Sequence, residues 1–447
     1  MASIASTVDD FKRAPERYLP EGLIHDAIDA TGHRWRDRML GPVVTVRFMI
    51  LQMLFGNISG RALLRLVDCG VSDSAYFAAR ARLPLDVLGR LLLNTLSRAR
   101  SCCPDAATWR GHRVLMIDGS GVSMPDTPAL RKAFGVPGRV ADKLGFPVMH
   151  TLWLFDHATG LLIDFVAGHG HTHDLAHAHR LHTMIEQGDV LLGDRAFCSY
   201  AHIALLLQQN LHGVFRAHQR LLIDFTPGRK PRHERKKGQR GGITASTQLN
   251  KFSKHDQLVQ WPKPPARNRP SWMTPEDYEQ LPEMIEVREL RYAVTRKGYR
   301  TRHVTLVTTL LDPRKYPKRD LAKLYQVRWS IETNLRHLKQ TMGMDVLRSK
   351  SVDGVKKELY AYAIAYNLVR QHMLQTANEQ GVPPDRISFI DALDALCHGG
   401  PTRLRINPNR PGRDEPRVIK RAKDQYSYMT KPRDELRQSL GITRVAA

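Results

Sequence analysis

The sequence contains no long apolar segment, and this absence excludes an integral membrane protein. The longest apolar stretch runs from Val43 to Phe55, and polar side chains interrupt it at Thr45, Arg47 and Gln52. It falls short of the roughly 20 residues that a membrane-spanning helix requires. The first ten residues hold neither a basic nor an apolar segment, so the sequence predicts no secretory signal. We therefore expect no membrane partner.

Cysteine is also scarce, which excludes two kinds of cross-linked small domain. The chain has five cysteines, an odd number, and no two of them are spaced as in C-x2-C. A disulfide framework or a zinc module would need paired spacings. We therefore expect a protein that works in a reducing, cytoplasmic environment.

Acidic residues are few relative to basic ones. The 447 residues include 44 Asp and Glu against 68 Lys and Arg, which gives a formal net charge of +24 at pH 7. Such a charge attracts polyanions, and nucleic acid is the first candidate partner. Apolar residues make up 42% and charged residues 25%, the balance of a folded chain. The length suggests two to four domains.

The first part of the chain has the pattern of a helical bundle. An apolar run from Val43 to Leu54 follows Pro42 and precedes Gly56, which are common residues at a helix start and end. Shorter amphipathic runs cover 62–67, 76–82 and 87–96. We expect residues 1–105 to form an N-terminal helical domain that binds DNA. Its many arginines fit solvated helix faces at least as well.

The middle part alternates strand and helix patterns, which predicts an α/β core with a mixed sheet. Short apolar or alternating runs suggest strands at 112–117, 148–155, 161–166, 190–193 and 213–215. We expect residues 106–216 to form the first part of this core and residues 301–378 the second part.

Two further segments are expected to be additions to the core. Residues 217–300 combine a strand pattern at 284–294 with seven Lys or Arg between Gly228 and Arg240, so we expect a basic, partly β insertion. Such a charge run is at least as often a disordered linker as a DNA-binding arm. We expect residues 379–447 to form a C-terminal helical and basic tail.

A long helix expected at 320–341 carries the most specific pattern. At 100° per residue, five side chains fall on one stripe beside an apolar stripe: Tyr325, Arg328, Glu332, Arg336 and Lys339. Arg328 and Arg336 each lie four residues from Glu332. Salt bridges that support the helix would therefore explain this stripe without any function.

The spacing Tyr-x2-Arg-x3-Glu-x6-Lys resembles the signature of insertion-sequence transposases of the DDE class, in the IS-four type. Two further segments resemble this family, one around Asp118 in Ile117-Asp118-Gly119-Ser120 and one around Asp194 in Leu192-Gly193-Asp194-Arg195. In this family two catalytic aspartates each follow a strand, and the signature glutamate is the third carboxylate. The resemblance covers residues 35–375.

The resemblance implies an RNase H-like fold and a catalytic site made of Asp118, Asp194 and Glu332. These three carboxylates would bind two Mg²⁺ or Mn²⁺ ions, since hard oxygen ligands suit these metals. A metal pair can both activate the attacking oxygen and stabilise the leaving one.

The same resemblance assigns DNA-binding roles to the signature helix. Tyr325, Arg328 and Lys339 would contact phosphates near the cleaved strand, and we add Arg336, which lies on the same stripe. Some family members pass through a DNA hairpin with the help of a Trp in the strand before this helix. Here the strand 303–310 has Val304 at that position, so the hairpin route is not implied.

The implied reaction is cut-and-paste transposition: cleavage at the terminal inverted repeats of an insertion sequence, then attack of the freed 3′-OH on target DNA. Both DNA molecules would be partners, together with a second copy of the chain in a homodimer. The expected location is the bacterial cytoplasm, in association with the nucleoid. The alternative is a catalytically inactive DNA-binding regulator with the same fold.

Other polar residues give weaker indications. His173 and His177 have a metal-ligand spacing, but no Glu follows His173 as in HExxH, so a zinc site is disfavoured. Asp126 could compete with Asp118 as the first carboxylate, yet it follows Pro125 in an expected loop. Three further residues are expected to be structural: Asp164, Asp189 and Cys198.

Overall fold

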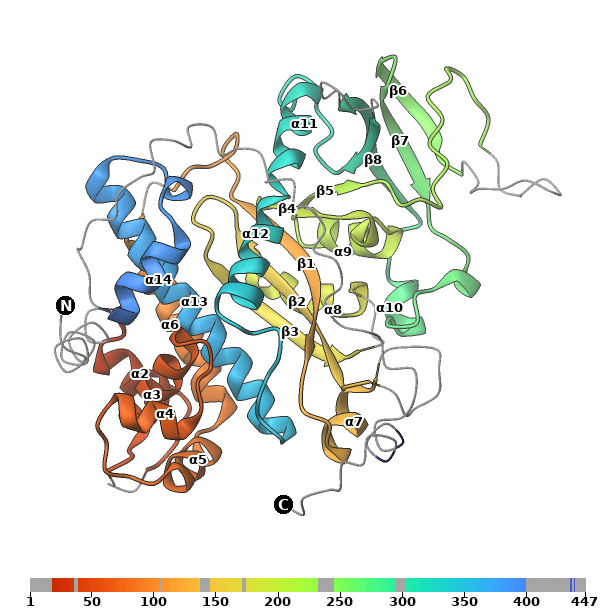
Figure 1. Cartoon of the computed structure of the whole chain (residues 1–447). Helices are drawn as coiled ribbons and strands as arrows, with labels where there is room; N and C mark the ends of the chain where they lie inside the picture. Colours follow the sequence, from red (N-terminus) through yellow and green to blue (C-terminus); the bar gives the residue numbers. More distant parts are fainter. Residues whose placement is uncertain are drawn as a thin grey trace.

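A nine-stranded mixed sheet organises the protein (Figure 1). The computed structural model describes residues 18–35, 39–103, 106–136, 145–170, 174–231, 245–294 and 302–398, together with Glu435 and Gln438. The strand order is β3-β2-β1-β4-β5-β9-β8-β7-β6. Within these residues, no helix has the length and apolar character needed to cross a membrane.

The first five strands form the RNase H-like core. An antiparallel meander of β1 (Val114–Ser123), β2 (Val148–Asp156) and β3 (Leu162–His169) opens it. The strands β4 (Val190–Gly193) and β5 (His212–Arg216) then add on the other side of β1, parallel to it. The order β3-β2-β1-β4-β5 with helices before the parallel strands is the RNase H-like arrangement, so the fold class expected from the sequence is confirmed.

Four more strands extend this sheet at the β5 edge. β9 (Arg302–Thr308) pairs with β5, and the outer strands follow in the order β8 (Met284–Val294), β7 (Asp256–Pro262) and β6 (Thr247–Ser253). The short helix α10 (Pro275–Glu279) connects β7 and β8. The expected insertion 217–300 therefore adds three strands to the core sheet. Residues 232–244, which hold most of its basic run, lie outside the described residues.

Each face of the sheet has its own apolar layer. On one face, Ile117, Leu191 and Phe215 belong to a cluster with residues of the helices α8 (Leu175–Leu181) and α9 (Tyr200–Gln208). On the other face, Met116, Leu192 and Val214 join a cluster with α11 (Lys318–Val327), α12 (Ser330–Arg336) and α13 (Val352–Gln380). Because side chains alternate along a strand, residues two positions beyond Met116, Leu192 and Val214 point toward α11 and α12.

The N-terminal helices pack beside the long helix α13 (Figure 1). They are α2 (Glu21–Ala30), α3 (Pro42–Leu54), α4 (Gly60–Leu66), α5 (Asp73–Arg82) and α6 (Leu85–Ser101). Within the described residues, two further helices are α7 (Pro128–Phe134) and α14 (Phe389–His398). The structure contains each of the four helices expected in this part of the chain, at 43–54, 62–67, 76–82 and 87–96. The observed ends differ from the expected ones by five residues at most. The division of the chain into five segments stays a prediction.

The strand that carries Asp118 is longer than the sequence suggested. We expected it to end at residue 117, but β1 continues to Ser123. Its parallel pairing with β4 stops at Met116, whereas its antiparallel pairing with β2 continues to the pair Ser123–Val148. The residues after Asp118 are therefore held as a strand by pairing with β2, and Ser123 at the strand end also bridges to Val346.

The prediction of a single continuous helix at 320–341 is also wrong. The chain forms α11 and α12 as separate helices and then a π-helical turn, His337–Thr341. The amides of Arg328 and Trp329 bond to the carbonyls three residues back, a tighter turn than the α-helix allows. Tyr325 of α11 is buried, at 6% exposure, whereas the side chain of Glu332 in α12 is 48% exposed.

Candidate active site

Two of the three expected catalytic carboxylates lie where the paired segments of two adjacent parallel strands end, Asp118 on β1 and Asp194 directly after β4. The register pairs Met116 of β1 with Leu192 of β4, so Asp118 and Asp194, each two residues further along, lie opposite each other. Adjacent strands are about 4.8 Å apart. Both side chains point to the face covered by α11 and α12.

Asp118 is the more buried of these carboxylates, and its surroundings favour the protonated form. One oxygen accepts a hydrogen bond from the Gly119 amide at 2.9 Å. Burial raises the pKa of Asp118 to about 6. Arg328 and the Gly119 amide act against this rise, while the negative charges of Asp194 and Asp174 add to it.

Asp194 follows β4 directly and is fixed by the chain after it. Its Oδ1 atom accepts a hydrogen bond from the Ala196 amide at 2.7 Å, which caps the short 3₁₀ helix Arg195–Phe197. Gly193 before it has room for no side chain, since an added Cβ would lie 2.9 Å from the Phe197 ring. The strand end and the cap together fix where this carboxylate lies.

Glu332 lies in the first turn of α12 and is connected to Asp118 by Arg328, which contacts both carboxylates. The guanidinium of Arg328 lies 3.8 Å from Asp118 Oδ2 and 3.5 Å from Glu332 Oε1. Arg328 itself is 7% exposed and stacks over the Trp329 ring at 5.0 Å. Burial raises the pKa of Glu332, and the neighbouring Arg328 opposes this rise. Arg328 therefore links the helix carboxylate to the strand carboxylate.

The donor set suits a divalent metal, although the carboxylates do not yet surround one point. Carboxylate oxygens are the ligands that Mg²⁺ and Mn²⁺ prefer. Within the residues that the structure describes, no three His, Cys, Asp or Glu side chains lie close enough to hold a metal ion. The positive charge between Asp118 and Glu332 is that of Arg328. Shared metal binding would require Glu332, whose side chain is about half exposed, to turn toward Asp118.

The other signature residues surround this group but differ in exposure. Tyr325 is buried, and burial raises its pKa to about 12. Lys339 is partly exposed, and its ammonium group donates to the Gly121 carbonyl of β1 at 2.9 Å. Arg336 is partly exposed and belongs to the last turn of α12. Lys339 thus lies over β1, at the position of Gly121, three residues beyond Asp118.

Arg216 occupies the next position in the row of Asp118 and Asp194, and the sequence analysis missed it. Leu192 pairs with Val214 of β5, so Arg216 lies beside Asp194 in the same way that Asp118 does. The sequence pattern predicts that this strand ends at residue 215, but β5 extends to Arg216. The available signal was a polar residue at the carboxyl end of a buried parallel strand, a position that the two aspartates share.

The remaining candidates from the sequence have structural partners. Asp126 forms an ion pair with Arg131, and Asp189 pairs with Arg113 and accepts from the Glu186 amide. Asp164 accepts from the Phe165 amide. Burial raises the pKa of the Cys198 thiol to about 12, so this thiol is no nucleophile at neutral pH.

Two further expectations concern the histidines and the missing Trp. His173 lies outside the described residues. Both ring nitrogens of His177 are buried and have no hydrogen-bond partner among the described residues, and these residues form no metal-binding group there. Val304 lies on β9 and pairs with Tyr292 of β8, so no Trp occupies that position.

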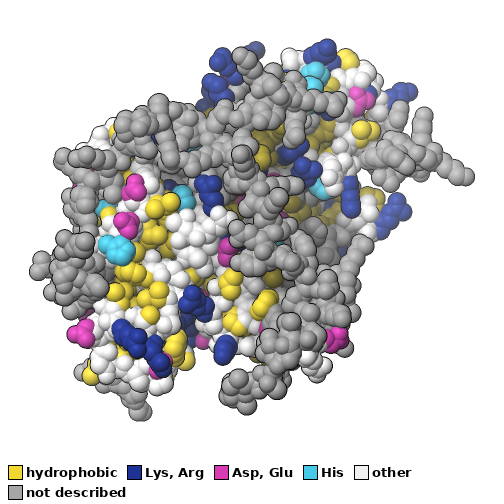
Figure 2. Space-filling view, in the orientation of Figure 1, with side chains coloured by type: hydrophobic (Ala, Val, Ile, Leu, Met, Phe, Trp, Pro, Cys, Tyr) yellow, Lys and Arg dark blue, Asp and Glu magenta, His cyan; other side chains and the backbone are white. Residues whose placement is uncertain are grey.

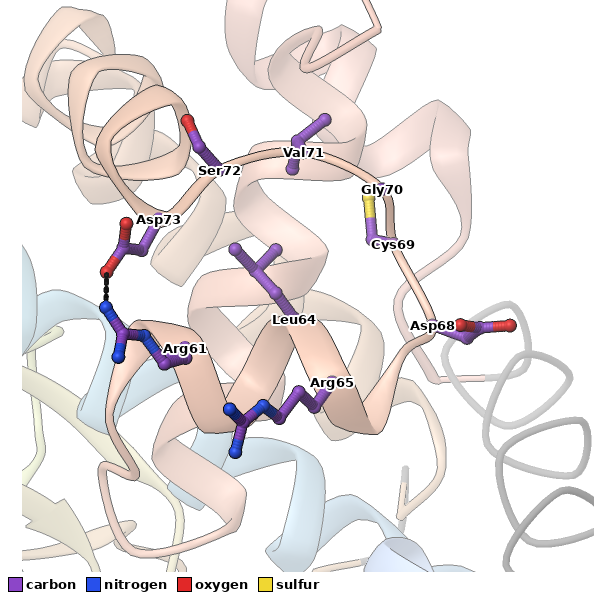
Figure 3. Close-up of a pocket in the computed structure, with 9 residues that line it drawn as sticks. All are labelled: Arg61, Leu64, Arg65, Asp68, Cys69, Gly70, Val71, Ser72 and Asp73. Atoms are coloured by element: carbon purple, nitrogen blue, oxygen red, sulfur yellow. Dashed lines mark ion pairs between the residues drawn. The ribbon is translucent and has the colours of Figure 1, made fainter.

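Positive charge is not confined to this site. Figure 2 shows lysine and arginine side chains near the outer strands β6–β8 and again near the N-terminal helices. A hollow of about 370 Å³ lies between α4 and α5, lined by Arg61, Arg65 and residues 68–73 (Figure 3). Arg61 forms an ion pair with Asp73 at 3.9 Å across it. This hollow contains none of the expected catalytic residues.

The chain is similar to known transposases. The family described as "Transposase DDE domain" matches residues 109–368, more than half of the chain. The chain is 28% identical over 343 residues to "Transposase InsG for insertion sequence element IS4" of Escherichia coli (strain K12), covering 76% of this chain and 70% of the relative. A solved structure of piggyBac transposase in a synaptic complex with hairpin DNA is 11% identical, with a TM-score of 0.41, covering 87% of this chain and 79% of that one.

Proposed function

This chain belongs to the family of DDE-domain transposases of the IS4 type, and on that premise we propose that it cuts DNA at the terminal inverted repeats of its own insertion sequence and joins the freed end to target DNA. The observation that carries the proposal is the row of Asp118 and Asp194 on β1 and β4 with Glu332 linked to it by Arg328. Asp118, Asp194 and Glu332 would be the catalytic carboxylates.

The proposed chemistry has two phosphoryl-transfer steps. A water oxygen attacks the phosphorus at the element boundary, the bond to the 3′-oxygen breaks, and that oxygen takes up a proton. The freed 3′-OH then loses its proton as it attacks a phosphorus of the target strand and displaces a target 3′-oxygen. Two Mg²⁺ or Mn²⁺ ions would polarise the attacking and leaving oxygens.

The chain's own residues would hold the carboxylates and the strand in place. Asp118 and Asp194 are fixed by the Gly119 and Ala196 amides, so they would bind metal with little rearrangement. Arg328 compensates Asp118 and Glu332 in the absence of metal. Once metal carries that role, the guanidinium would be free to bind a DNA phosphate.

Further signature residues would contact the DNA backbone. Lys339 and Arg336 are partly exposed cations next to the site, and phosphate contacts from such side chains fix the position of a strand without reading its sequence. Tyr325 would add a phenolic donor. We also infer that the active assembly is a homodimer bridging two transposon ends, and that it acts on the nucleoid in the bacterial cytoplasm.

A second candidate function is a catalytically inactive DNA-binding regulator of the same fold. One observation favours it: Arg328 forms ion pairs with two of the three carboxylates, and within the described residues these carboxylates do not converge on a metal position. A site arrested in this state would bind DNA through its cations and leave it uncut.

DNA cleavage separates the two functions. Labelled DNA carrying the ends that flank the gene is incubated with the protein and Mg²⁺ or Mn²⁺, beside Glu332→Ala. Glu379→Ala, an exposed glutamate near the end of α13, serves as the matched control. A nick at the element boundary from the wild type and the control, but not from Glu332→Ala, supports the enzyme. Specific binding without a nick from any of the three supports the regulator.

A further inference from the structure

Two histidines are buried beside the turn that follows Asp194, on the side of the sheet away from the proposed active site. His182 begins a short 3₁₀ turn after α8, and His202 belongs to α9. Each is 1% exposed, and their Nε2 atoms lie 3.1 Å apart. The helices α8 and α9 cover the sheet face opposite to α11 and α12, so this pair can contact neither DNA nor metal at the carboxylates.

The hydrogen bonds of the pair allow only one arrangement of protons. Burial lowers the pKa of both imidazoles, that of His202 to about 4, so both are neutral at pH 7. The Nδ1 atom of His202 lies 2.8 Å from the Phe197 carbonyl oxygen, which can only accept, so Nδ1 carries the proton. The Nε2 atom of His202 is then an acceptor, and the Nε2 atom of His182 must donate to it.

The carbonyl that accepts from His202 belongs to the turn that fixes the second aspartate. Phe197 ends the short 3₁₀ helix after Asp194, and within this helix the Ala196 amide donates to Asp194 Oδ1 at 2.7 Å. A path of hydrogen bonds therefore runs from His182 through His202 to the Phe197 carbonyl, and so to the turn that holds the carboxylate.

Apolar side chains would fill this part of the core at lower cost. A buried imidazole must regain inside the protein the hydrogen bonds that it made to water. The Nδ1 atom of His182 is buried and has no partner within the described residues, which makes the pair less stabilising than apolar groups of the same shape. Apolar groups could not supply a directed donor to the Phe197 carbonyl. This donor is the feature that distinguishes the pair from ordinary core packing.

We propose that His202 and His182 are positioning residues for Asp194, and that they hold the turn after β4 in the shape that directs this carboxylate toward the metal. The inference rests on the proposed function and adds two residues to it. His202 would act on the Phe197 carbonyl, and His182 would act on His202 by keeping its proton on Nδ1. Without either hydrogen bond the turn could shift, and the Asp194 carboxylate would bind metal more weakly.

Crossed substitutions by Asn and Gln test these two hydrogen bonds. The amide nitrogen of Asn is attached to Cγ, like Nδ1 of histidine, and that of Gln is attached to Cδ, as Nε2 is attached to Cδ2. His202→Asn therefore keeps the donor to Phe197, and His202→Gln loses it. The order is reversed at the other histidine, where His182→Gln keeps the donor to His202 and His182→Asn loses it. Packing alone would favour Gln at both positions, because Asn leaves the larger cavity.

Metal binding is measured directly and through cleavage. Mn²⁺ binding to the protein alone is followed by the electron paramagnetic resonance signal of the free ion, and cleavage of labelled end DNA is followed over a range of Mg²⁺ concentrations. We expect His202→Gln and His182→Asn to weaken Mn²⁺ binding roughly tenfold and to require more Mg²⁺, with most of the cleavage rate restored at saturation. His202→Asn and His182→Gln should stay near wild type. Two histidines keep the test decisive if one variant fails to fold.

Two controls show whether the effect passes through Asp194. His372→Gln changes another buried histidine, which lies on α13 and bonds to the Tyr18 hydroxyl, and it should leave Mn²⁺ binding unchanged. In an Asp194→Asn background, His202→Gln should weaken Mn²⁺ binding no further, because the carboxylate on which it acts is absent.

The outcomes separate this inference from the proposed function. If both histidines tolerate Gln better than Asn, the pair only fills the core and the inference is refuted, whereas the transposase stands if wild type cuts end DNA. An equal loss from His202→Gln with and without Asp194 would refute it as well, as would a wild type that binds no more Mn²⁺ than Asp194→Asn. If the crossed pattern appears in Mn²⁺ binding but wild type cuts no end DNA, the positioning role is supported and the proposed function fails.

Discussion

Replacing Asp118 by Asn should make the metal-free protein more stable at neutral pH, although it removes a catalytic carboxylate. Burial raises the pKa of Asp118 in the folded chain from the ordinary 3.8 to about 6. Between these two values the unfolded chain has lost the proton and the folded chain still binds it. Stability therefore falls as the pH rises from about 4 to about 6 and stays low above that.

The size of this effect follows from the two pKa values. The difference between 3.8 and about 6 corresponds to about 3 kcal/mol in the free energy of unfolding. The side chain of Asp118 is 23% exposed, so solvent screens this charge only partly. Asn has a similar shape and no charge. We therefore expect Asp118→Asn to gain up to about 3 kcal/mol at pH 8 and almost nothing at pH 4.

Urea unfolding in EDTA at pH 4, 6 and 8 measures this difference. Tryptophan fluorescence reports the sheet, because buried Trp153 pairs with Asp118 across β1 and β2. The control is Asp29→Asn, at an exposed position of α2, which should change stability by less than about 0.5 kcal/mol. A variant no more stable than wild type at pH 8, or a gain that is the same at pH 4 and pH 8, would refute the reasoning.

Two other predictions concern the neighbours of Asp118. A Cβ at residue 119 would lie 2.1 Å from Asp174 Oδ1, so Gly119→Ala should shift β1 and remove most DNA cleavage. Adding Asp174→Ala should restore part of the cleavage. No recovery in the double variant would count against this contact. Arg328 lowers the pKa of Asp118, so in Arg328→Gln at subsaturating Mg²⁺ the rise of cleavage rate with pH should move to higher pH. An unchanged pH–rate profile would show that Arg328 does not hold Asp118 ionised.

The core strands were accessible from the sequence because their patterns are local. Apolar residues at 190–193 mark a strand buried on both faces, and β4 covers those residues. The strand expected at 284–294 is β8 with the same ends. Both aspartates were assigned from their resemblance to family segments, and each comes directly after a run of buried apolar residues on a core strand.

The parts that the sequence did not predict depend on contacts between distant segments. Gly119-Ser120-Gly121 has the composition of a turn, and only pairing with β2 holds it as strand. The break at Arg328 and Trp329 contains neither Gly nor Pro, and it occurs where Tyr325 is buried on the sheet and Arg328 forms an ion pair with Asp118. No spacing along the chain could place Arg328 between a strand carboxylate and a helix carboxylate.

The central claim is that Asp118, Asp194 and Glu332 act as one metal-dependent cleavage site, and Asp194→Ala tests it most directly. Single-turnover cleavage of labelled end DNA in Mg²⁺ is compared for wild type, Asp194→Ala and the surface control Asp29→Ala, with binding measured on the same DNA. The account predicts that Asp194→Ala binds the ends as tightly as wild type and leaves them uncut, while the control cuts normally. Metal-dependent cleavage by Asp194→Ala at the wild-type rate would contradict it.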